Sequence, residues 1–157
     1  EVRLRTPAFA NDSKPIFGIS KGGALLRYDA TSGKQLKELK GANPTSSLLS
    51  ADSKQLFAYS GNDKEVIVLD VETGARVGTF SGATKGISSV AISPDGALFV
   101  AASEDKVVRL YDGPTRTLLR KFTIEKVGFV ALRADKSLLA VGDSVLLKLY
   151  AIPAAGK

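Results

Sequence analysis

The sequence predicts an all-β fold built from repeated four-stranded antiparallel units. Short apolar runs alternate with polar turns along the whole chain, and the longest uninterrupted apolar run is only about six residues, too short for a buried helix. The same pattern of runs and turns returns at intervals of about 41 residues. A single unit of this size cannot bury both of its faces, so we expect neighbouring units to pack on one another.

The clearest unit lies in the middle of the chain. Ile87–Ile92 is a small and apolar run that ends at the turn Ser93–Gly96, where proline presets one backbone angle and glycine accepts a positive φ. Ala97–Ala102 is a second apolar run, and Glu104–Lys106 makes another polar turn. Val107–Tyr111 is rich in β-branched and aromatic residues. These runs predict three strands joined by two tight turns.

Two sets of landmarks recur with the same period. The third strands end at Tyr28, Leu69, Tyr111 and Tyr150, and the first turns contain Asp12, Asp52, Asp95 and Asp135. A period of about 41 residues is typical of the four-stranded blades of a β-propeller and too long for leucine-rich or ankyrin repeats. We therefore expect blades at about residues 4–40, 46–81, 87–123 and 127–151, within one partial propeller domain over residues 1–157.

A fourth strand is expected in each of the first three repeats. The segments DATSGKQLKEL, DVETGARVGTF and DGPTRTLLRKF align without a gap, with Leu36, Val77 and Leu119 at one shared position. Arg116 stands where the first two turns have glycine, and Pro114 is expected to tighten that turn instead. Only a short segment with a proline follows Tyr150, so we expect the last blade to be incomplete.

The third strands also share two apolar positions, three residues and one residue before the residue that ends the strand. Side chains at such spacing lie on one face of a sheet, where they are expected to pack against the neighbouring blade. Arg27 interrupts the pattern, which predicts poor packing or a polar contact in the first blade. The first position holds Leu25, Val66, Val108 and Leu147, and the second holds Arg27, Val68, Leu110 and Leu149.

The segment ISPDGALFVAASEDKVVRLYD, followed by a DxxTG-type turn, resembles the WD-repeat family. Blades of that family carry a Ser-Pro-Asp-Gly turn and end in Trp-Asp, and the resemblance covers the chain as four degenerate repeats. The family's tetrad of Trp, Ser/Thr, His and Asp cannot form, because the chain has neither Trp nor His. Only its Asp remains, at Asp63 and Asp105, which we interpret as turn residues. Lactonase-like and quinoprotein-like propellers share much of this pattern.

Four blades with an incomplete last one would expose the inner face of the first blade and the third strand of the fourth. Exposed sheet edges promote association. We therefore predict half or part of a ring of about seven or eight blades, completed by a second copy, a partner chain or further sequence, with a compact four-bladed ring as the alternative. A chain without any Met, and beginning at Glu1, indicates a processed form, an excised piece or an engineered fragment.

Residue types that carry much enzyme chemistry are missing. The chain has no Cys and no His, which excludes thiol nucleophiles, disulfides, imidazole metal ligands and His-based triads. The recurring aspartates fall one per turn, so we expect neither a calcium site nor a catalytic carboxylate pair. The glycine-rich segments Gly18–Gly23 and Gly82–Gly86 lack the spacing of phosphate-binding loops. We predict no catalytic residue, metal or cofactor.

Five lysines are expected on one rim of the blades. Loops between second and third strands share a rim with loops that join blades, because successive strands alternate in direction. The net charge of +6 permits an acidic partner such as RNA, but acidic neighbours weaken the field and these loops contain no aromatic residue for base stacking. The candidate partner-binding residues are Lys21, Lys64, Lys85, Lys106 and Lys126.

The resemblance implies a non-catalytic scaffold or adaptor that presents loops to protein partners in a larger assembly, in the cytoplasm or in the nucleus and nucleolus. Binding of RNA or phosphate by the lysines is the main alternative. A propeller fragment without activity of its own and a lactonase-like or quinoprotein-like enzyme are further alternatives. We expect no signal peptide and no membrane span, since a spanning helix needs roughly 20 apolar residues.

Overall fold

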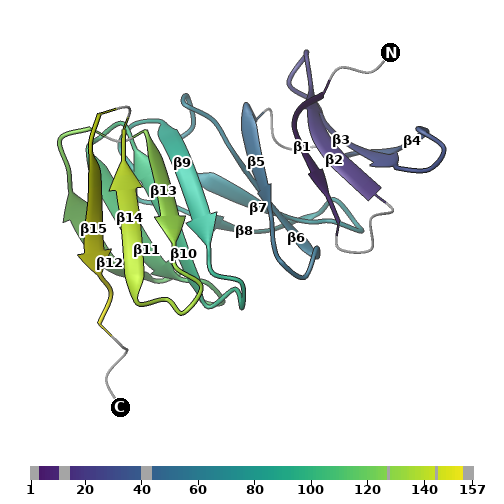
Figure 1. Ribbon diagram of the computed structural model, residues 1–157. Coiled ribbons are helices and arrows are strands. Elements are labelled where there is room, and N and C mark those ends of the chain that lie inside the picture. The colour runs from purple at the N-terminus through teal and green to yellow at the C-terminus, as the bar shows by residue number, and fades with distance from the viewer. Residues whose placement is uncertain (1–3, 11–14, 40–43, 127, 144, 154–157) are drawn as a thin grey trace. The chain divides into compact units, whose positions relative to one another are not determined.

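The computed structural model describes residues 4–10, 15–39, 44–126, 128–143 and 145–153. Within these residues the chain forms fifteen strands and no helix (Figure 1). The strands make three four-stranded sheets and one three-stranded sheet, each antiparallel and each with its strands in chain order. The predicted all-β fold of repeated blades is confirmed. We number the sheets as blades 1 to 4.

Strand bounds follow the repeat. Blade 1 contains β1 (Leu4–Phe9), β2 (Pro15–Ser20), β3 (Leu25–Asp29) and β4 (Gln35–Leu39). Blade 2 contains β5 (Ser46–Leu49), β6 (Gln55–Tyr59), β7 (Val66–Asp70) and β8 (Arg76–Phe80). Blade 3 contains β9 (Ile87–Ile92), β10 (Leu98–Ser103), β11 (Val107–Asp112) and β12 (Leu118–Thr123). Blade 4 contains β13 (Phe129–Leu132), β14 (Leu138–Gly142) and β15 (Leu147–Ala151).

The chain divides into two compact units. The first unit holds blades 1 and 2, and the second holds blades 3 and 4 together with residues 61–64. A single domain over residues 1–157 stays a prediction.

The core of the first unit lies between blades 1 and 2. Arg27 reaches across to blade 2, where its Nη1 donates a hydrogen bond to Oε2 of Glu72 at 3.0 Å. This confirms the polar contact predicted at that break in the apolar pattern. The cluster is made by Phe17, Ile19, Leu25 and Leu39 of blade 1 with Leu49, Leu56, Ile67 and Leu69 of blade 2.

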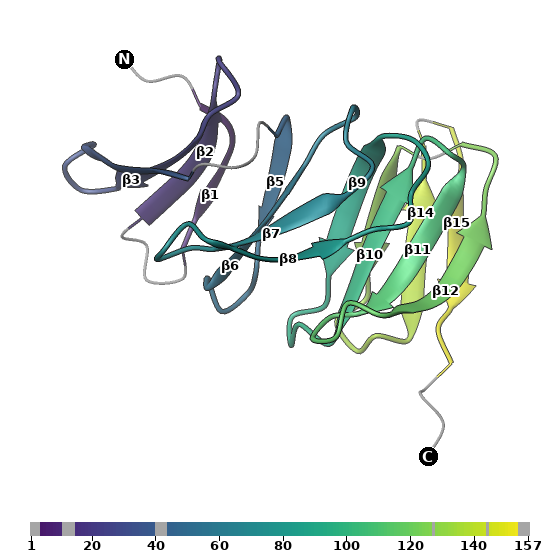
Figure 2. The ribbon, with the colours of Figure 1, turned by 180° about the vertical axis from the view of Figure 1, so that it is seen from behind.

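The core of the second unit lies between blades 3 and 4. Figures 1 and 2 show β13, β14 and β15 lying against the sheet of β9 to β12. The rings of Phe122 and Tyr150 meet across this core with centroids 5.1 Å apart. Blade 3 contributes Val100, Ala102, Val108, Leu110 and Phe122, and blade 4 contributes Val130, Leu139 and Val141.

The turn before each outer strand has one left-handed residue. Gly33 and Gly74 have φ of 66° and 72°, and Arg116 adopts the same conformation with φ of 61°. Its N–H donates to the carbonyl of Asp112 at 2.9 Å, as the equivalent glycines donate in the earlier turns. Arg116 itself, rather than Pro114, therefore takes over the conformational role of glycine, at the steric cost that a Cβ brings to a positive φ.

A β-bulge follows in each outer strand. The register shifts by one residue between β3 and β4, between β7 and β8, and between β11 and β12. The unpaired residues are the aliphatic ones that align in the sequence, Leu36, Val77 and Leu119, and all three side chains are exposed. A bulged residue has no cross-strand partner, which explains why these positions contribute to neither core.

Candidate interaction surface

Three loops of the second unit are joined by their backbones. The N–H of Ile87 donates to the carbonyl of Asp63 at 3.1 Å, and the N–H of Glu104 donates to the carbonyl of Gly86 at 2.9 Å. Gly86 approaches Gly61 so closely that a Cβ at position 86 would lie 1.6 Å from the carbonyl oxygen of Gly61. Residues 61–64, 82–86 and 103–106 therefore form one rim, which we call the loop rim.

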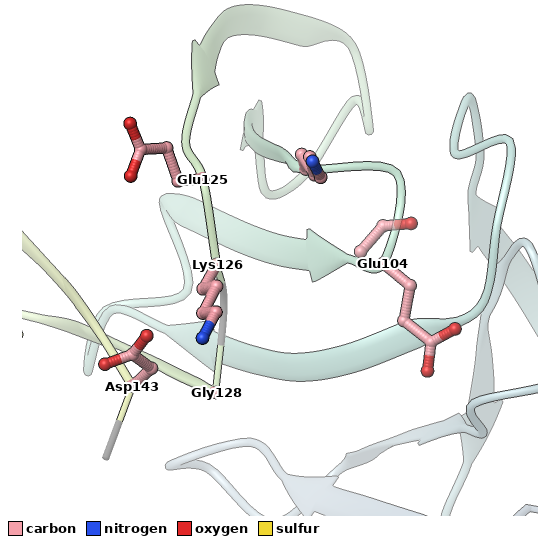
Figure 3. Close-up of a pocket in the computed structure, with 7 residues that line it drawn as sticks. Glu104, Glu125, Lys126, Gly128 and Asp143 are labelled. Carbon is pink, nitrogen blue, oxygen red and sulfur yellow. The ribbon is translucent and has the colours of Figure 1, made fainter. Parts of the chain in front are cut away.

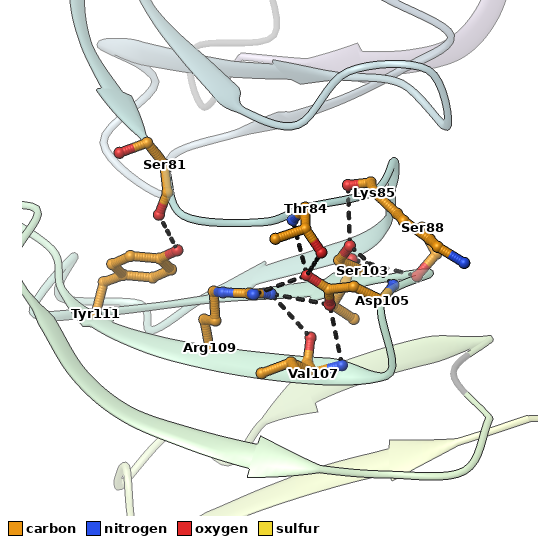
Figure 4. Close-up of polar contacts among 10 residues, drawn as sticks. Ser81, Thr84, Lys85, Ser88, Ser103, Asp105, Val107, Arg109 and Tyr111 are labelled. Carbon is orange, nitrogen blue, oxygen red and sulfur yellow. Dashed lines mark hydrogen bonds and ion pairs between the residues drawn. The ribbon is translucent and has the colours of Figure 1, made fainter.

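A buried ion pair holds this rim together (Figure 4). The guanidinium of Arg109 donates to Oδ1 and Oδ2 of Asp105 at 3.0 and 2.7 Å, and the two side chains are only 4% and 6% exposed. The N–H of Thr84 donates to the same carboxylate at 2.8 Å. The N–H of Val107 donates to it at 3.1 Å, which is the turn contact expected from the sequence. Asp105 thus caps its own turn and also binds the loop between blades.

Asp105 stays ionised in this setting. Burial alone would raise the pKa of its carboxyl group, but the hydrogen bonds and positive charge of Arg109, with the donors of Thr84, outweigh burial and hold the pKa well below its usual range. Two further bonds reinforce the loop, from the Ser103 hydroxyl to the carbonyl of Lys85 at 3.0 Å and from the Tyr111 hydroxyl to that of Ser81 at 2.6 Å. The WD-repeat tetrad combines such an aspartate with a histidine, and this chain has no histidine. Here Arg109 and Thr84 bind Asp105 instead.

A pocket of about 540 Å³ opens on this rim between the loops of blades 3 and 4 (Figure 3). Two lysines and three carboxylates line it, so its charge is mixed. A second pocket of about 380 Å³ shares part of this lining and adds the apolar side chains of Ile124, Val141 and Leu146. The lining of the first pocket is Ser103, Glu104, Lys106, Glu125, Lys126, Gly128 and Asp143.

The five predicted lysines are distributed unevenly. Lys106 and Lys126 line the same pocket, and Lys106 sits at a left-handed turn position with φ of 65°. Lys64 and Lys85 are exposed on the loops of the same rim, whereas Lys21 is exposed in the β2–β3 turn of the other unit. The structure thus brings two of the five lysines into one pocket and places two more on the loop rim itself.

The turn aspartates lie where the repeat places them. Asp52, Asp95 and Asp135 are exposed, and each carboxylate accepts bonds from a serine hydroxyl and a backbone N–H of its own turn. These bonds lower the pKa of all three carboxyl groups. For Asp95 the largest cause of the lowered pKa is the hydrogen bond that Lys136 donates to it. Asp63 is an exposed residue of the β6–β7 loop. Asp12 lies outside the described residues.

Sequence reasoning missed two residues of this surface. Asp143 lines both pockets, and its pKa is lowered first by the N–H groups of Val145 and Leu146 and then by the charge of Lys126. The repeat period places it level with Ser103, a signal that could have identified it. Arg109 has no such signal, because its partner depends on how the loops meet.

Within the described residues no group of three or more Asp, Glu, His or Cys side chains is placed to hold a metal ion. No helix of the described chain is long and apolar enough to cross a membrane.

Comparisons with known proteins agree with this architecture. Residues 74–112 match the model of the family described as WD domain, G-beta repeat. The chain is 33% identical over 116 residues to WD repeat-containing protein AAC3 of Dictyostelium discoideum, which covers 71% of the chain and 24% of that protein. It is 29% identical over 105 residues to U3 small nucleolar RNA-associated protein 21 of Saccharomyces cerevisiae, which covers 67% of the chain and 11% of that protein.

A third relative matches over more of the chain. Human Striatin-4 is 24% identical over 150 residues, which covers 91% of this chain and 19% of that protein. The chain therefore spans less than a quarter of the length of each of these relatives. The matched repeat, the named relatives and the recurring four-stranded sheets lead to one conclusion: the chain belongs to the WD-repeat family.

Proposed function

We propose that this chain is a non-catalytic protein-interaction module, and that the pocket on its loop rim binds a segment of a protein partner within a larger assembly. The pocket is the observation that carries the proposal, because it is lined by opposite charges and a buried ion pair holds one of its loops, residues 103–106, in place. The name of one similar protein, Eukaryotic translation initiation factor 3 subunit I of Bombyx mori, describes part of an assembly. The similarity to this protein supports a role inside the cell for this chain as well.

The signs of the pocket charges favour a polypeptide over a polyanion. Lys106 and Lys126 stand beside Glu104, Glu125 and Asp143, so phosphates drawn to the lysines would also meet three carboxylates. A protein segment that carries both acidic and basic side chains can pair with both sets. Such complementarity sets specificity and register more than raw affinity.

Selection from a displayed library of random peptides tests the pocket. We expect enriched peptides to contain both acidic and basic residues, and the double substitution Lys106→Glu and Lys126→Glu to weaken their binding at least about tenfold, because each lost charge pair becomes a repulsive one. Fluorescence anisotropy with a selected peptide measures the dissociation constant.

A matched control carries the same change in net charge at lysines that line neither pocket. Lys54→Glu and Lys121→Glu replace two exposed lysines that line neither pocket, and this variant should bind as the unmodified protein does. Equal binding by the pocket variant and the unmodified protein, or selection of no peptide above background, would contradict the proposal.

RNA binding is a second candidate. The net charge of +6, the lysines of the loop rim and the name of the similar U3 small nucleolar RNA-associated protein 21 favour it. The exposure of Lys64, Lys85 and Lys106 on the loops of the loop rim supports this candidate.

The RNA candidate predicts steep dependence on salt. The logarithm of the association constant for polyuridine should fall linearly with the logarithm of the salt concentration. The triple substitution Lys64→Glu, Lys85→Glu and Lys106→Glu should reduce the magnitude of this slope by about 0.7 for each phosphate contact that is lost. Anisotropy titrations at several salt concentrations measure both. If polyuridine does not bind, or if its binding does not depend on salt, the RNA candidate is wrong and only the protein-interaction proposal remains.

A further inference from the structure

The outer strand of blade 3 has an unpaired edge. In the described part of the chain β12 is the last strand of its sheet and pairs only with β11 (Figure 2). The N–H of Ile124, the residue that follows this strand, donates to the carbonyl of Lys106 at 2.9 Å. Since the backbone groups of an antiparallel strand point alternately to either side, those of Lys121 and Thr123 point away from β11. The N–H and C=O groups of these two residues can therefore pair with a further strand.

The side chains along this edge are apolar and basic. Leu118 and Leu119 are 39% and 53% exposed, and Arg120 and Lys121 are exposed as well. The guanidinium of Arg120 lies 5.0 Å from the centroid of the Phe122 ring. Among the described residues neither of the two cations forms an ion pair with a carboxylate. We call residues 118–123 the β12 edge.

The outer strands of blades 1 and 2 use their cations within the protein. In β4 the ammonium of Lys37 donates to the carbonyls of Glu72 and Thr73 at 3.1 and 2.6 Å. In β8 the guanidinium of Arg76 forms an ion pair with Glu65 at 3.2 Å. Among the outer strands that the structure describes, β12 alone has two exposed cations without an acidic partner. The charge of the β12 edge therefore favours an acidic partner.

We propose that the β12 edge binds an acidic, extended segment of a protein partner, which adds to blade 3 as a fifth strand. Main-chain hydrogen bonds to Lys121 and Thr123 supply affinity, as in other cases of strand addition. Carboxylates beside Arg120 and Lys121 supply selectivity. Because consecutive residues of a strand point to opposite faces, the expected segment carries two adjacent acidic residues, one for each cation.

Other occupants fit this edge less well. A second copy of the chain would bring two basic edges together, and like charges on paired strands are destabilising. Phosphates of an RNA or of a lipid surface can neutralise the cations, but neither presents N–H and C=O groups at the spacing of a strand. None of residues 118–123 lines either pocket, so this site is separate from the proposed function.

Fluorescence anisotropy with the labelled peptide VTVDEVTV tests the β12 edge. We expect binding that the double substitution Arg120→Glu and Lys121→Glu weakens at least about tenfold, because each favourable charge pair becomes repulsive. Lys34→Glu with Lys54→Glu is the matched control, which makes a similar change in net charge at two exposed lysines outside β12 and should bind as the unmodified protein does.

Proline substitutions distinguish strand addition from attraction between charges. The peptide VTPDEPTV keeps the acidic pair but lacks the N–H group on either side of it, so it should bind more weakly. In the protein, Thr123→Pro removes an N–H that points away from β11, and should weaken binding of VTVDEVTV about fivefold or more. Thr123→Val keeps that N–H and should bind normally. Thermal unfolding verifies that each variant is folded.

Amide hydrogen exchange followed by nuclear magnetic resonance gives an independent measurement. The amides of Lys121 and Thr123 should exchange more slowly when VTVDEVTV is bound, since each gains an acceptor on the added strand. Exchange that the peptide leaves unchanged at both positions would contradict strand addition.

The two proposals can fail separately. Lys106→Glu with Lys126→Glu should leave the binding of VTVDEVTV unchanged, because neither lysine belongs to the β12 edge. Lys121 is one of the control lysines in the pocket experiment. A selected peptide that the control variant weakens, and that the pocket variant does not, is therefore bound at the β12 edge.

Three results would overturn the proposal. The first is no binding of VTVDEVTV, and the second is equal binding of VTVDEVTV and VTPDEPTV. The third is peptide binding that Arg120→Glu with Lys121→Glu leaves unchanged. If this variant instead loses binding to polyuridine or to phosphatidylserine vesicles, the edge is a site for phosphates and not for a strand.

Discussion

Arg109→Leu is expected to lower the free energy of unfolding by about 3–5 kcal/mol, one of the two largest effects of a single substitution that we expect in this chain. The guanidinium of Arg109 is the cation that offsets burial of the Asp105 carboxylate, and the two side chains are almost fully buried. Without it the carboxylate is left charged in a site of low polarity, or must take up a proton. Urea unfolding followed by circular dichroism measures the change.

The double variant Asp105→Asn with Arg109→Leu tests whether the loss of stability in Arg109→Leu comes from the unpaired charge of Asp105 or from the lost packing of the arginine side chain. It removes the unpaired carboxylate, and the single amide oxygen can still accept from one of the N–H groups of Val107 and Thr84, which bond to different oxygens of the aspartate. It should therefore be more stable than Arg109→Leu alone. Asp112→Asn serves as the control at an exposed turn, where the effect should be much smaller. If Arg109→Leu and Asp112→Asn cost the same, the ion pair does not hold the loop rim.

The same pair predicts how stability depends on pH. Because the folded protein lowers the pKa of Asp105, this residue contributes stability that is complete above its unfolded pKa of about 3.9, and that is lost as the pH falls below this value. The unmodified protein should therefore lose more stability between about pH 5 and pH 3 than the double variant Asp105→Asn with Arg109→Leu. Equal losses would contradict the assignment.

Gly86→Ala is the second substitution with a large expected effect, a loss of about 3 kcal/mol or more in the free energy of unfolding. The added Cβ would lie 1.6 Å from the carbonyl oxygen of Gly61 and 2.3 Å from its carbon, and both atoms belong to the backbone. The bond from Ile87 to the carbonyl of Asp63 fixes the same two loops, so they cannot separate without losing it. Thermal and urea unfolding measure the loss.

Gly61→Ala is the matched control on the other side of this contact. A Cβ at Gly61 meets only the flexible end of Glu104, at 3.7 Å, and should change stability by less than about 1 kcal/mol. Equal destabilisation by both substitutions would show that the cost lies in glycine's own conformational freedom rather than in the close approach of the two loops.

Local sequence features predicted most of the fold. The turn Ser93–Gly96 and its counterparts lie between the first and second strands, because side chains of Ser and Asp bond to the backbone only a few residues away. The contact made by Arg27 was also predictable, since a charged residue on an apolar face requires a polar partner. Arg116 shows the limit of this reasoning: the turn demands a positive φ whatever residue occupies it.

The candidate surface was predictable only in part. Alternating strand direction puts Lys106 and Lys126 on the same rim, but the pocket between them depends on the placement of Asp143 in the next blade. The aspartates likewise look alike in the sequence. Asp52 and Asp105 both accept a bond from the backbone two residues further on, and only the position of Arg109 and Thr84 makes Asp105 the centre of a buried network.

The sequence by itself determined the repeat, the order of strands and the apolar face of each blade, because these follow from interactions between residues close together in the chain. Tertiary structure decided which of several identical positions is buried. Leu147 and Leu149 are aliphatic and have the same register as Val108 and Leu110, yet only the latter pair is covered by a following blade. Burial depends on what packs against a surface, and no local pattern encodes that.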